Sequence, residues 1–398
     1  MTDFAATRAA FHLPDGLVYM NGNSLGPLPR AATDRVATAM QDQWGDMLIT
    51  AWNRAGWMDM PRRVGDRIAR IIGALAGSVV MGDTLSIKVF QALSAALNLA
   101  QPGRTKVLSD TGNFPTDLYM AHGLLGALDR GITLHTVPPE EVAAHLGPDV
   151  AVLMLTQVDY RTGRMHDMAA LTAAAQAKGI VVIWDLAHSA GAVDLDLAGC
   201  KAEFAVGCTY KFLNGGPGAP AFIYVRPDLA DQIRPILSGW LGHAAPFAFD
   251  LYYTPGDGID RMRVGTPAIL QMSALDAALD VWDAVDLADL RTACITLSER
   301  LIASIETACP GLHLISPRDP AQRGSQVCFA HDQGYAVMQA LIAQGIIGDF
   351  RAPNVIRFGI TPLFQTPADM DHVATTLGTI LRDRLWDTPA FHTRAAVT

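Results

Sequence analysis

One stretch of the sequence decides the fold: AVLMLTQVDYRTGRMHDMAALTAAAQAKGIVVIWD (residues 151–185). Residues 151–158 form a continuous apolar run, as does the segment 180–184, and such runs are typical of buried strands. Between the two runs, Asp167 is placed to cap a helix and Gly179 to end it. The order strand, helix, strand predicts a βαβ unit, in which the two strands are parallel.

Upstream segments repeat this alternation and predict one large α/β domain with a mostly parallel sheet between layers of helices. Beyond residue 265 the pattern changes. Thr266 and Pro267 predict a helix start, and the apolar spacing of residues 290–305 predicts a further helix. Short apolar strands follow at 325–330 and 355–360, which favours a smaller C-terminal α/β domain. The upstream strands are predicted at 79–81, 106–108 and 132–137.

Composition limits the possible functions. The 398 residues are 50% hydrophobic, which suffices for one large domain and a smaller one. The net charge of -9 and the lack of a basic run argue against a nucleic-acid partner. No apolar run reaches the roughly 18 residues of a membrane span, and no signal peptide is evident, so we expect a cytoplasmic protein. Five scattered cysteines predict neither disulfides nor a metal site.

Three residues that differ in chemistry converge on one edge of the predicted sheet. Asp185 follows the strand 180–184 directly, His188 comes three residues later, and Lys211 follows the apolar segment 202–206. Ligands bind at the carboxyl ends of parallel strands. Apolar neighbours of Lys211 favour its neutral amine, which a Schiff base requires. The alternatives are that Asp185 only caps a turn and that Lys211 is a surface lysine.

Other segments offer binding groups. The helix predicted to start at Thr84 presents free N–H groups that, with Ser86, suit a phosphate. FPTD (114–117) combines an aromatic ring, a helix start and a carboxylate, or is simply a capped helix start. Arg357 suits a substrate carboxylate, or else an acidic partner within the protein. The glycines of GGPG (215–218) follow the lysine and precede a strand, which does not fit a phosphate loop.

These motifs together resemble pyridoxal-phosphate enzymes of the aminotransferase fold, class V branch. The resemblance is carried by the segment 184–225, with its Asp-x-x-His and Lys-x-x-x-Gly-Gly-Pro patterns. Within that branch, four motifs are similar to those of the kynureninase family: YMNGNSLGPLP (19–29), NFPTDLY (113–119), GCTYKFLNGGPG (207–218) and SGWLGH (238–243). The resemblance implies an aspartate-aminotransferase-like fold and a pyridoxal 5'-phosphate cofactor.

The resemblance also implies roles for individual residues. Lys211 is implied to bind the cofactor covalently and to shuttle protons, with Tyr210 as a second catalytic group. Asp185 is implied to pair with the pyridine nitrogen and Phe114 to stack on the ring. The remaining cofactor shell is implied to consist of Leu85, Ser86, Pro115, Thr116, Asp117, Thr156 and His188, with Trp240 and Thr266 coming from the neighbouring subunit. The implied substrate-binding residues are Arg357, Trp52, Asn23 and Ser24.

The implied reaction is hydrolytic Cβ–Cγ cleavage of L-kynurenine to anthranilate and L-alanine, in the kynurenine pathway of tryptophan catabolism and NAD biosynthesis. Trp52 and Thr266 stand where members that prefer 3-hydroxykynurenine have His and Asn, so we expect kynurenine to be the better substrate. The resemblance implies a homodimer. It also implies four parts: an N-terminal segment (1–40), a large cofactor-binding domain (41–265), a connecting helix (266–286) and a small domain (287–398).

An alternative within the same branch is a cysteine desulfurase or selenocysteine lyase. That chemistry requires a reactive cysteine on an accessible loop. The candidate, Cys328, lies in a segment that alternates like a strand, and we expect it to be a small core residue.

Overall fold

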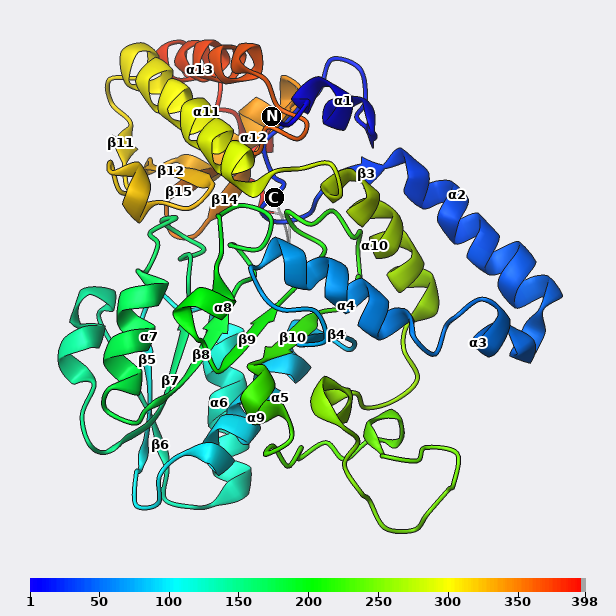
Figure 1. Ribbon diagram of the computed structural model, residues 1–398. Coiled ribbons are helices and arrows are strands. Elements are labelled where there is room, and N and C mark those ends of the chain that lie inside the picture. The colour runs from blue at the N-terminus through cyan, green and yellow to red at the C-terminus, as the bar shows by residue number, and fades with distance from the viewer. Residues whose placement is uncertain (395–398) are drawn as a thin grey trace.

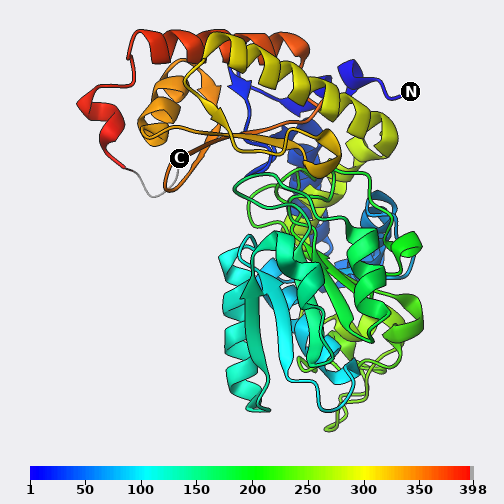
Figure 2. The same ribbon diagram turned by 90° about the vertical axis from the view of Figure 1, so that its left-hand side faces the viewer.

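The computed structural model describes residues 1–394 and shows two lobes. The larger lobe, lower in Figure 1, is built around a sheet, and the smaller lobe above it holds the C-terminal third of the chain (Figures 1 and 2). The helix α10 (Ile269–Trp282) ends shortly before α11 (Leu287–Ala308), the first helix of the smaller lobe. The arrangement confirms the α/β fold predicted from the sequence.

The large lobe contains one seven-stranded sheet. The predicted βαβ unit is present, because β7 and β8 are parallel and α7 (Met168–Gln176) connects them. Asp167 caps α7, its side chain accepting a hydrogen bond from the Ala170 N–H. The sheet order is β4 (Val79–Met81), β10 (Phe222–Val225), β9 (Phe204–Gly207), β8 (Val181–Asp185), β7 (Val150–Thr156), β5 (Lys106–Asp110) and β6 (Thr133–Val137).

Strand β10 departs from the parallel pattern. It pairs antiparallel with both β9 and β4, whereas β9, β8, β7, β5 and β6 are parallel to one another. The segment between β9 and β10 carries Lys211 and the GGPG glycines and contains no long crossover helix. Without such a helix to carry the chain back across the sheet, the chain turns and runs in the opposite direction, so an antiparallel pair results.

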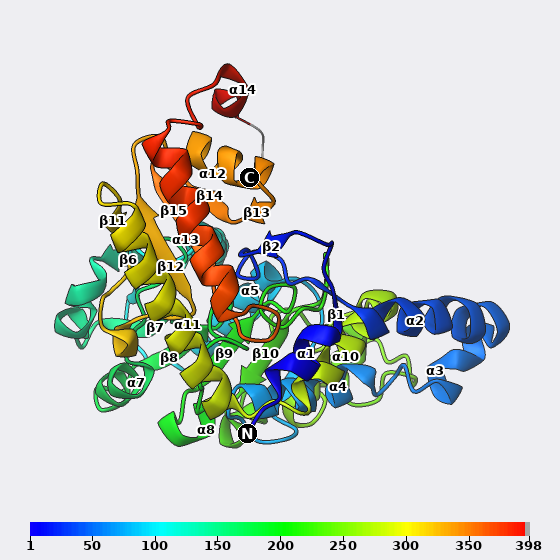
Figure 3. The same ribbon diagram turned by 90° about the horizontal axis from the view of Figure 1, so that it is seen from above.

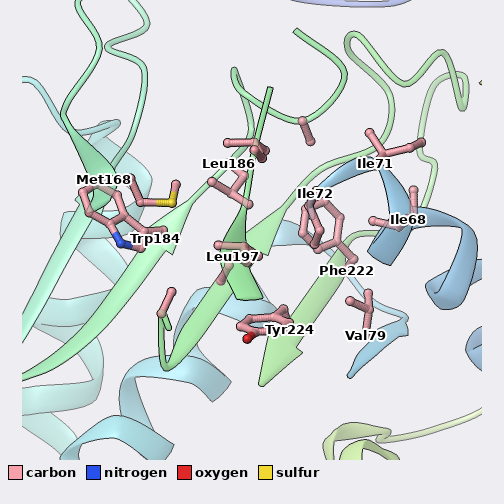
Figure 4. Close-up of a cluster of buried hydrophobic side chains, with 14 of the residues drawn as sticks. Ile68, Ile71, Ile72, Val79, Met168, Trp184, Leu186, Leu197, Phe222 and Tyr224 are labelled. Carbon is pink, nitrogen blue, oxygen red and sulfur yellow. The ribbon is translucent and has the colours of Figure 1, made fainter. Parts of the chain in front are cut away.

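Apolar residues on the two faces of the sheet form two separate cores. Successive residues of β8 alternate between them: Trp184 lies in one core and Ile183 in the other. The first core packs under α4 (Met60–Ile71) and includes Ile68, Phe222 and Tyr224 (Figure 4). Helices α7, α8 (Leu197–Cys200) and α10 contribute to this core, and α5 (Leu85–Leu99), α6 (Pro115–Leu128) and α9 (Pro227–Ala230) contribute to the other.

The small lobe has its own sheet and core. Helix α11 is the helix that the apolar spacing predicted. Its buried side chains include those that the spacing indicated: Leu290, Cys294, Leu297, Leu301 and Ile305. Helix α11 packs against α13 (Pro367–Arg382). The antiparallel sheet has the order β11 (His313–Leu314), β12 (Gln326–Ala330), β15 (Val355–Gly359), β14 (Asp349–Arg351), and α12 (Gly334–Ala343) and α14 (Pro389–His392) complete the lobe.

The N-terminal segment contacts the small lobe. Strand β2 (Val18–Tyr19) pairs in parallel with β13 (Ile346–Ile347). The elements that flank β2 are α1 (Phe4–Ala9), β1 (Phe11–His12), β3 (Leu28–Pro29) and α2 (Arg30–Thr38), and α2 projects away from the body of the molecule together with α3 (Ala51–Arg54) (Figure 3). The division into four parts remains a prediction, and residues 395–398 of its small domain lie outside the described residues.

The predicted helix start at Thr266 is wrong. Helix α10 begins at Ile269, and Ala268 occupies the N-cap position with a ψ of 80°, outside the helical range. Pro267 lies two residues before α10, because proline fits the extended approach to a helix as well as its first turn. No helix within residues 1–394 combines the length and the apolar character that crossing a bilayer requires.

The central sheet provides a test of the core. Leu153 in β7 is fully buried, and we expect Leu153→Ala to lower the free energy of unfolding by about 2–5 kcal/mol, because it leaves a cavity in a packed core. Urea denaturation followed by circular dichroism measures the change. Leu75→Ala is the matched control, since Leu75 is 60% exposed. Equal effects of the two substitutions would contradict the assignment of Leu153 to the core.

Candidate active site

A cavity of about 160 Å³ lies at the carboxyl edge of the large sheet, where the N-terminal segment and the small lobe meet it. Every lining residue except Tyr160, Ala187 and Arg351 is one that the sequence predicted for the site. The lining residues are Asn23, Ser24, Leu85, Phe114, Thr156, Tyr160, Asp185, Ala187, His188, Tyr210, Lys211, Arg351 and Arg357.

Lys211 is at the centre of this cavity. Its Nζ lies 3.0 Å from His188 Nε2 and 6.0 Å from the centroid of the Phe114 ring. Burial lowers the pKa of His188 well below its ordinary value, and the nearby charges of Lys211 and Arg357 act in the same direction. The imidazole is therefore neutral, and its Nε2 is within hydrogen-bonding distance of Lys211 Nζ. Lys211 is not a surface lysine.

Two carboxyl groups, Asp185 and Asp117, are buried beside each other below Lys211. Burial raises the pKa of Asp117 well above its ordinary value, and the charge of Asp185 raises it further. Burial also raises the pKa of Asp185, while the charge of Lys211 opposes this rise. The two adjacent carboxyl groups therefore resist ionising together.

Asp185 does cap a turn, as one of its two alternatives stated, but its carboxylate has other contacts as well. Asp185 Oδ1 accepts a hydrogen bond of 2.8 Å from the Ala187 N–H, and Thr156 Oγ1 lies 3.5 Å from Oδ2. The same carboxylate lines the cavity. It is therefore fixed by its own turn and still available to a ligand.

The segment FPTD is also more than a capped helix start. Phe114 occupies the N-cap position of α6, and no side chain caps that helix. The Phe114 ring lines the cavity and meets the Tyr160 ring edge-on, with centroids 5.2 Å apart and an angle of 85°. Asp117 is turned into the interior instead of capping the helix.

Tyr210 remains a phenol at any ordinary pH. Burial raises its pKa, and the neighbouring Cys208 adds to this effect. The Tyr210 ring centroid is 5.8 Å from Lys211 Nζ. The backbone carbonyl of Tyr210 accepts a hydrogen bond of 2.7 Å from the Gly26 N–H. The N-terminal segment is thereby attached to the lysine loop.

Arg357 has the acidic partner that was one of its two alternatives, and it also lines the cavity, where binding of a substrate carboxylate stays a prediction. Its guanidinium is 1% exposed and forms an ion pair with Asp349. Nη2 also donates to Ser24 Oγ at 2.8 Å, and Nη1 donates to the Tyr160 carbonyl. Burial tends to raise the pKa of Asp349, but the charges of Arg357 and Arg351 outweigh burial and lower it. Asp349 is therefore ionised.

Several predicted residues lie outside the cavity of this chain. Ser86, Pro115 and Thr116 are half-buried in the first turns of α5 and α6, next to residues that line it. Trp52 in α3 packs edge-on against Trp57. Trp240 is 41% exposed and donates from Nε1 to the Pro246 carbonyl at 2.6 Å, and Thr266 is exposed. Their roles stay predictions.

Sequence reasoning missed Tyr160, Ala187 and Arg351. Tyr160 follows β7 and lies in a loop without a motif, so nothing in the sequence singled it out. Arg351 precedes Arg357 by six residues, and only the hairpin of β14 and β15 places both on one cavity. No cluster of residues that suits a metal ion occurs within residues 1–394.

Comparison with known proteins decides the family. The chain is 46% identical to a kynureninase from Pseudomonas fluorescens over 99% of its own length and 96% of that protein. The chain belongs to the kynureninase family. A kynureninase from Burkholderia pseudomallei matches with the same identity and coverage, and residues 290–377 match the model of the kynureninase C-terminal domain.

Solved structures with the same fold include more distant enzymes. A cysteine desulfurase from Thermococcus onnurineus superimposes with a TM-score of 0.80 at 15% identity, covering 95% of this chain and 98% of that one. A cysteine desulfurase from Escherichia coli gives 0.79 at 18% identity, covering 96% and 99%. A C-DES variant with glycine covalently linked to its PLP cofactor gives 0.81 at 19% identity, covering 93% and 98%. These likenesses show a shared fold.

The cysteines argue against desulfurase chemistry in this chain. Cys328 is fully buried in β12, as its strand-like pattern predicted, and burial raises its pKa to about 12. Cys208, Cys294 and Cys309 are also buried, and only Cys200 is partly exposed. A sulfur acceptor needs an accessible thiolate, which Cys328 does not provide.

Thiol reactivity tests this conclusion. In the folded protein we expect Ellman's reagent to react within minutes with at most one thiol, Cys200, because the other four are buried. All five should react in denaturant, and Cys200→Ser should abolish the reaction of the folded protein. Rapid labelling of Cys328 in the folded protein, identified by mass spectrometry, would contradict the buried placement.

Proposed function

We propose that this protein is a pyridoxal-phosphate-dependent kynureninase, which hydrolyses the Cβ–Cγ bond of L-kynurenine to anthranilate and L-alanine. The observation that carries the proposal is the 46% identity to kynureninases over 99% of the chain. The site agrees with it, because one cavity holds an amine, a buried carboxylate and an arginine: Lys211, Asp185 and Arg357.

The residues of the cavity fit pyridoxal phosphate. Asp185 lines the cavity, and its carboxylate suits a protonated pyridine nitrogen. His188 Nδ1 and Asp117 Oδ2 are buried without a hydrogen-bond partner among the described residues, as expected where a ligand belongs. The start of α5 at Leu85 presents N–H groups that no side chain caps, which suits a phosphate. When bound, the cofactor supplies an electron sink for bonds broken at the substrate.

The cofactor-binding residues proposed are Phe114 against the ring, Lys211 as the covalent attachment, and Asp185 at the pyridine nitrogen. We propose a homodimer in which Trp240 and Thr266 reach the phosphate site of the partner. Their exposure and their position outside this chain's own cavity support that arrangement. The remaining proposed members are Leu85, Ser86, Pro115, Thr116, Asp117, Thr156, His188 and Tyr210.

The overall reaction adds one water molecule across the Cβ–Cγ bond. The oxygen of water goes to Cγ, which becomes the carboxylate of anthranilate, and a hydrogen goes to Cβ, which becomes the methyl group of alanine. Lys211 is placed to take and return protons, with the neutral His188 within hydrogen-bonding distance. Tyr210, kept protonated by burial, is placed to donate a proton. Arg357 binds the α-carboxylate, with Asn23 and Ser24 beside it.

Finer aspects of the function follow from the same resemblance. Trp52 and Thr266 favour kynurenine over 3-hydroxykynurenine, which we propose to be the poorer substrate. A place in the kynurenine pathway of tryptophan catabolism and a cytoplasmic location complete the proposal. The small-molecule substrate agrees with the acidic net charge of -9, which does not suit nucleic acid.

Activity and cofactor attachment test this proposal together. The purified holoenzyme should release fluorescent anthranilate from L-kynurenine, and borohydride should fix the cofactor to the peptide containing Lys211. We expect Lys211→Ala to lose measurable turnover, because both the attachment and the proton carrier are removed. Alanine formation from L-cysteine without anthranilate from kynurenine would favour a desulfurase instead.

Arg357→Lys tests the carboxylate site. We expect KM for L-kynurenine to rise by about 10- to 100-fold, because a lysine keeps the charge but cannot reproduce the bidentate guanidinium contact. Steady-state kinetics of anthranilate release measures the effect. Arg161→Lys, in an exposed loop, is the control and should leave KM unchanged. Unaltered KM in Arg357→Lys would remove Arg357 from the substrate site.

A further inference from the structure

The hairpin of β14 and β15 places three charged residues on one side of the small sheet. Asp349 and Arg351 are two positions apart on β14, so their side chains lie on the same face. Asp349 is directly opposite Arg357 on β15 in the antiparallel register. The backbone pairing therefore determines that an aspartate lies between two arginines.

A single oxygen of Asp349 organises these groups. Asp349 Oδ2 forms an ion pair with Arg357 and accepts a hydrogen bond of 2.6 Å from Ser24 Oγ. The same atom lies 2.9 Å from Arg351 Nη2. Both guanidinium groups line the cavity. Asp349 therefore sets the distance between two cations at one end of the cavity.

The two arginines differ in what remains available to a ligand. The Arg357 side chain is 1% exposed, and its Nη atoms are engaged by Asp349, Ser24 and the Tyr160 carbonyl. The Arg351 side chain is 36% exposed. Its guanidinium donates to the Phe350 carbonyl at 3.1 Å and to Ser24 Oγ at 3.4 Å, and it forms an ion pair with Asp349. Arg351 therefore shares Asp349 and Ser24 with Arg357 and differs from it in being more exposed.

The charges at this end of the cavity do not balance. Two guanidinium groups and one ionised carboxylate leave a net charge of one positive unit in a partly buried place. Buried charges are unfavourable unless they are paired. The carboxylate of one substrate molecule would neutralise the set. The two arginines also act on His188, because the charges of Arg357 and Arg351 both contribute to lowering its pKa.

We propose that Arg351 is a second substrate-binding residue, which holds the α-carboxylate of the amino-acid substrate together with Arg357, and that Asp349 is the positioning residue for both arginines. This proposal rests on the proposed function only in assigning an amino acid as the substrate. The carboxylate lies between two guanidinium groups, and Asp349 and Ser24 hold them in place behind it.

The test compares two ligands that differ only in the carboxylate. The holoenzyme is titrated with L-alanine and with L-alaninamide while the absorbance of the bound cofactor is followed. The ratio of the two dissociation constants measures carboxylate recognition. We expect Arg351→Gln to reduce the preference for L-alanine, measured as this ratio, by about 10- to 100-fold, which corresponds to the loss of a charge-assisted hydrogen bond. The dissociation constant of L-alaninamide should change little. Asp349→Asn should reduce the same ratio without being a ligand itself.

Two further variants keep the proposal falsifiable. Arg351→Lys retains the charge but not the planar guanidinium group with its paired N–H donors. Its ratio of dissociation constants should therefore fall between those of the wild type and Arg351→Gln. Arg161→Gln removes an exposed arginine next to Tyr160 and should leave the ratio unchanged. An unchanged ratio in Arg351→Gln, or an equal loss of affinity for both ligands, would overturn the proposal. If Arg351→Gln does not load cofactor, a wild-type ratio in Arg351→Lys would overturn it as well.

The outcome is separable from the kynureninase assignment. Failure to produce anthranilate would reject that assignment, whereas the alanine titration reports on any amino-acid substrate. A holoenzyme that is inactive on kynurenine but shows an Arg351-dependent preference for L-alanine would support the arginine pair. An active kynureninase with no such dependence would leave Arg357 as the sole arginine for the carboxylate.

Discussion

Parallel pairing of β7 and β8 places Thr156 directly opposite Asp185 at the carboxyl edge of the large sheet. Because β9 is parallel to β8, the chain leaves β9 at this same edge and reaches Tyr210 and Lys211 three and four residues later. The helix that follows β5 begins there with Phe114 at its N-cap. The direction of the strands therefore brings acid, amine and aromatic ring together, although they are far apart in sequence.

The cavity is lined by groups of opposite charge. Asp185 lines it with Asp117 buried behind, and Arg351 and Arg357 line it with Asp349 between them. Lys211 and the neutral His188 line it as well and contact each other. A cofactor with a protonated ring nitrogen suits Asp185, and a substrate carboxylate suits the arginines. A bound pair of these two molecules would satisfy both.

Local pattern predicted much of this arrangement. The cap at Asp167 and the buried face of α11 depend on residues a few positions apart, and the βαβ unit is marked by the order of its elements, so the sequence displays all three directly. The resemblance to a known family supplied most of the residues of the cavity. Thr266 failed as a helix start because proline two residues before α10 fits the extended approach to a helix as well as its first turn.

What the sequence did not display depends on pairing between strands. The antiparallel direction of β10 goes with a connection that contains no crossover helix, and an apolar run gives the same pattern for a strand of either direction. Arg351 and Asp349 became part of the site only when β14 was registered against β15. Tyr160 contacts the site through its backbone carbonyl and its ring. Every residue has a backbone carbonyl, so the sequence does not mark Tyr160 for the first of these contacts.

The loop that carries Tyr160 joins the two ends of the cavity mechanically. Its backbone is held by the small lobe, since Gln326 Nε2 donates to the Asp159 carbonyl at 2.7 Å and Ser316 Oγ donates to the Thr162 carbonyl at 2.6 Å. Arg357 donates to the Tyr160 carbonyl, while the Tyr160 ring contacts Phe114. A rotation of the small lobe away from the large one would have to break these hydrogen bonds. The distance between Arg357 and the aromatic rings of Tyr160 and Phe114 is therefore fixed. A substrate must match this distance in order to place its carboxylate and its reacting carbon at the same time.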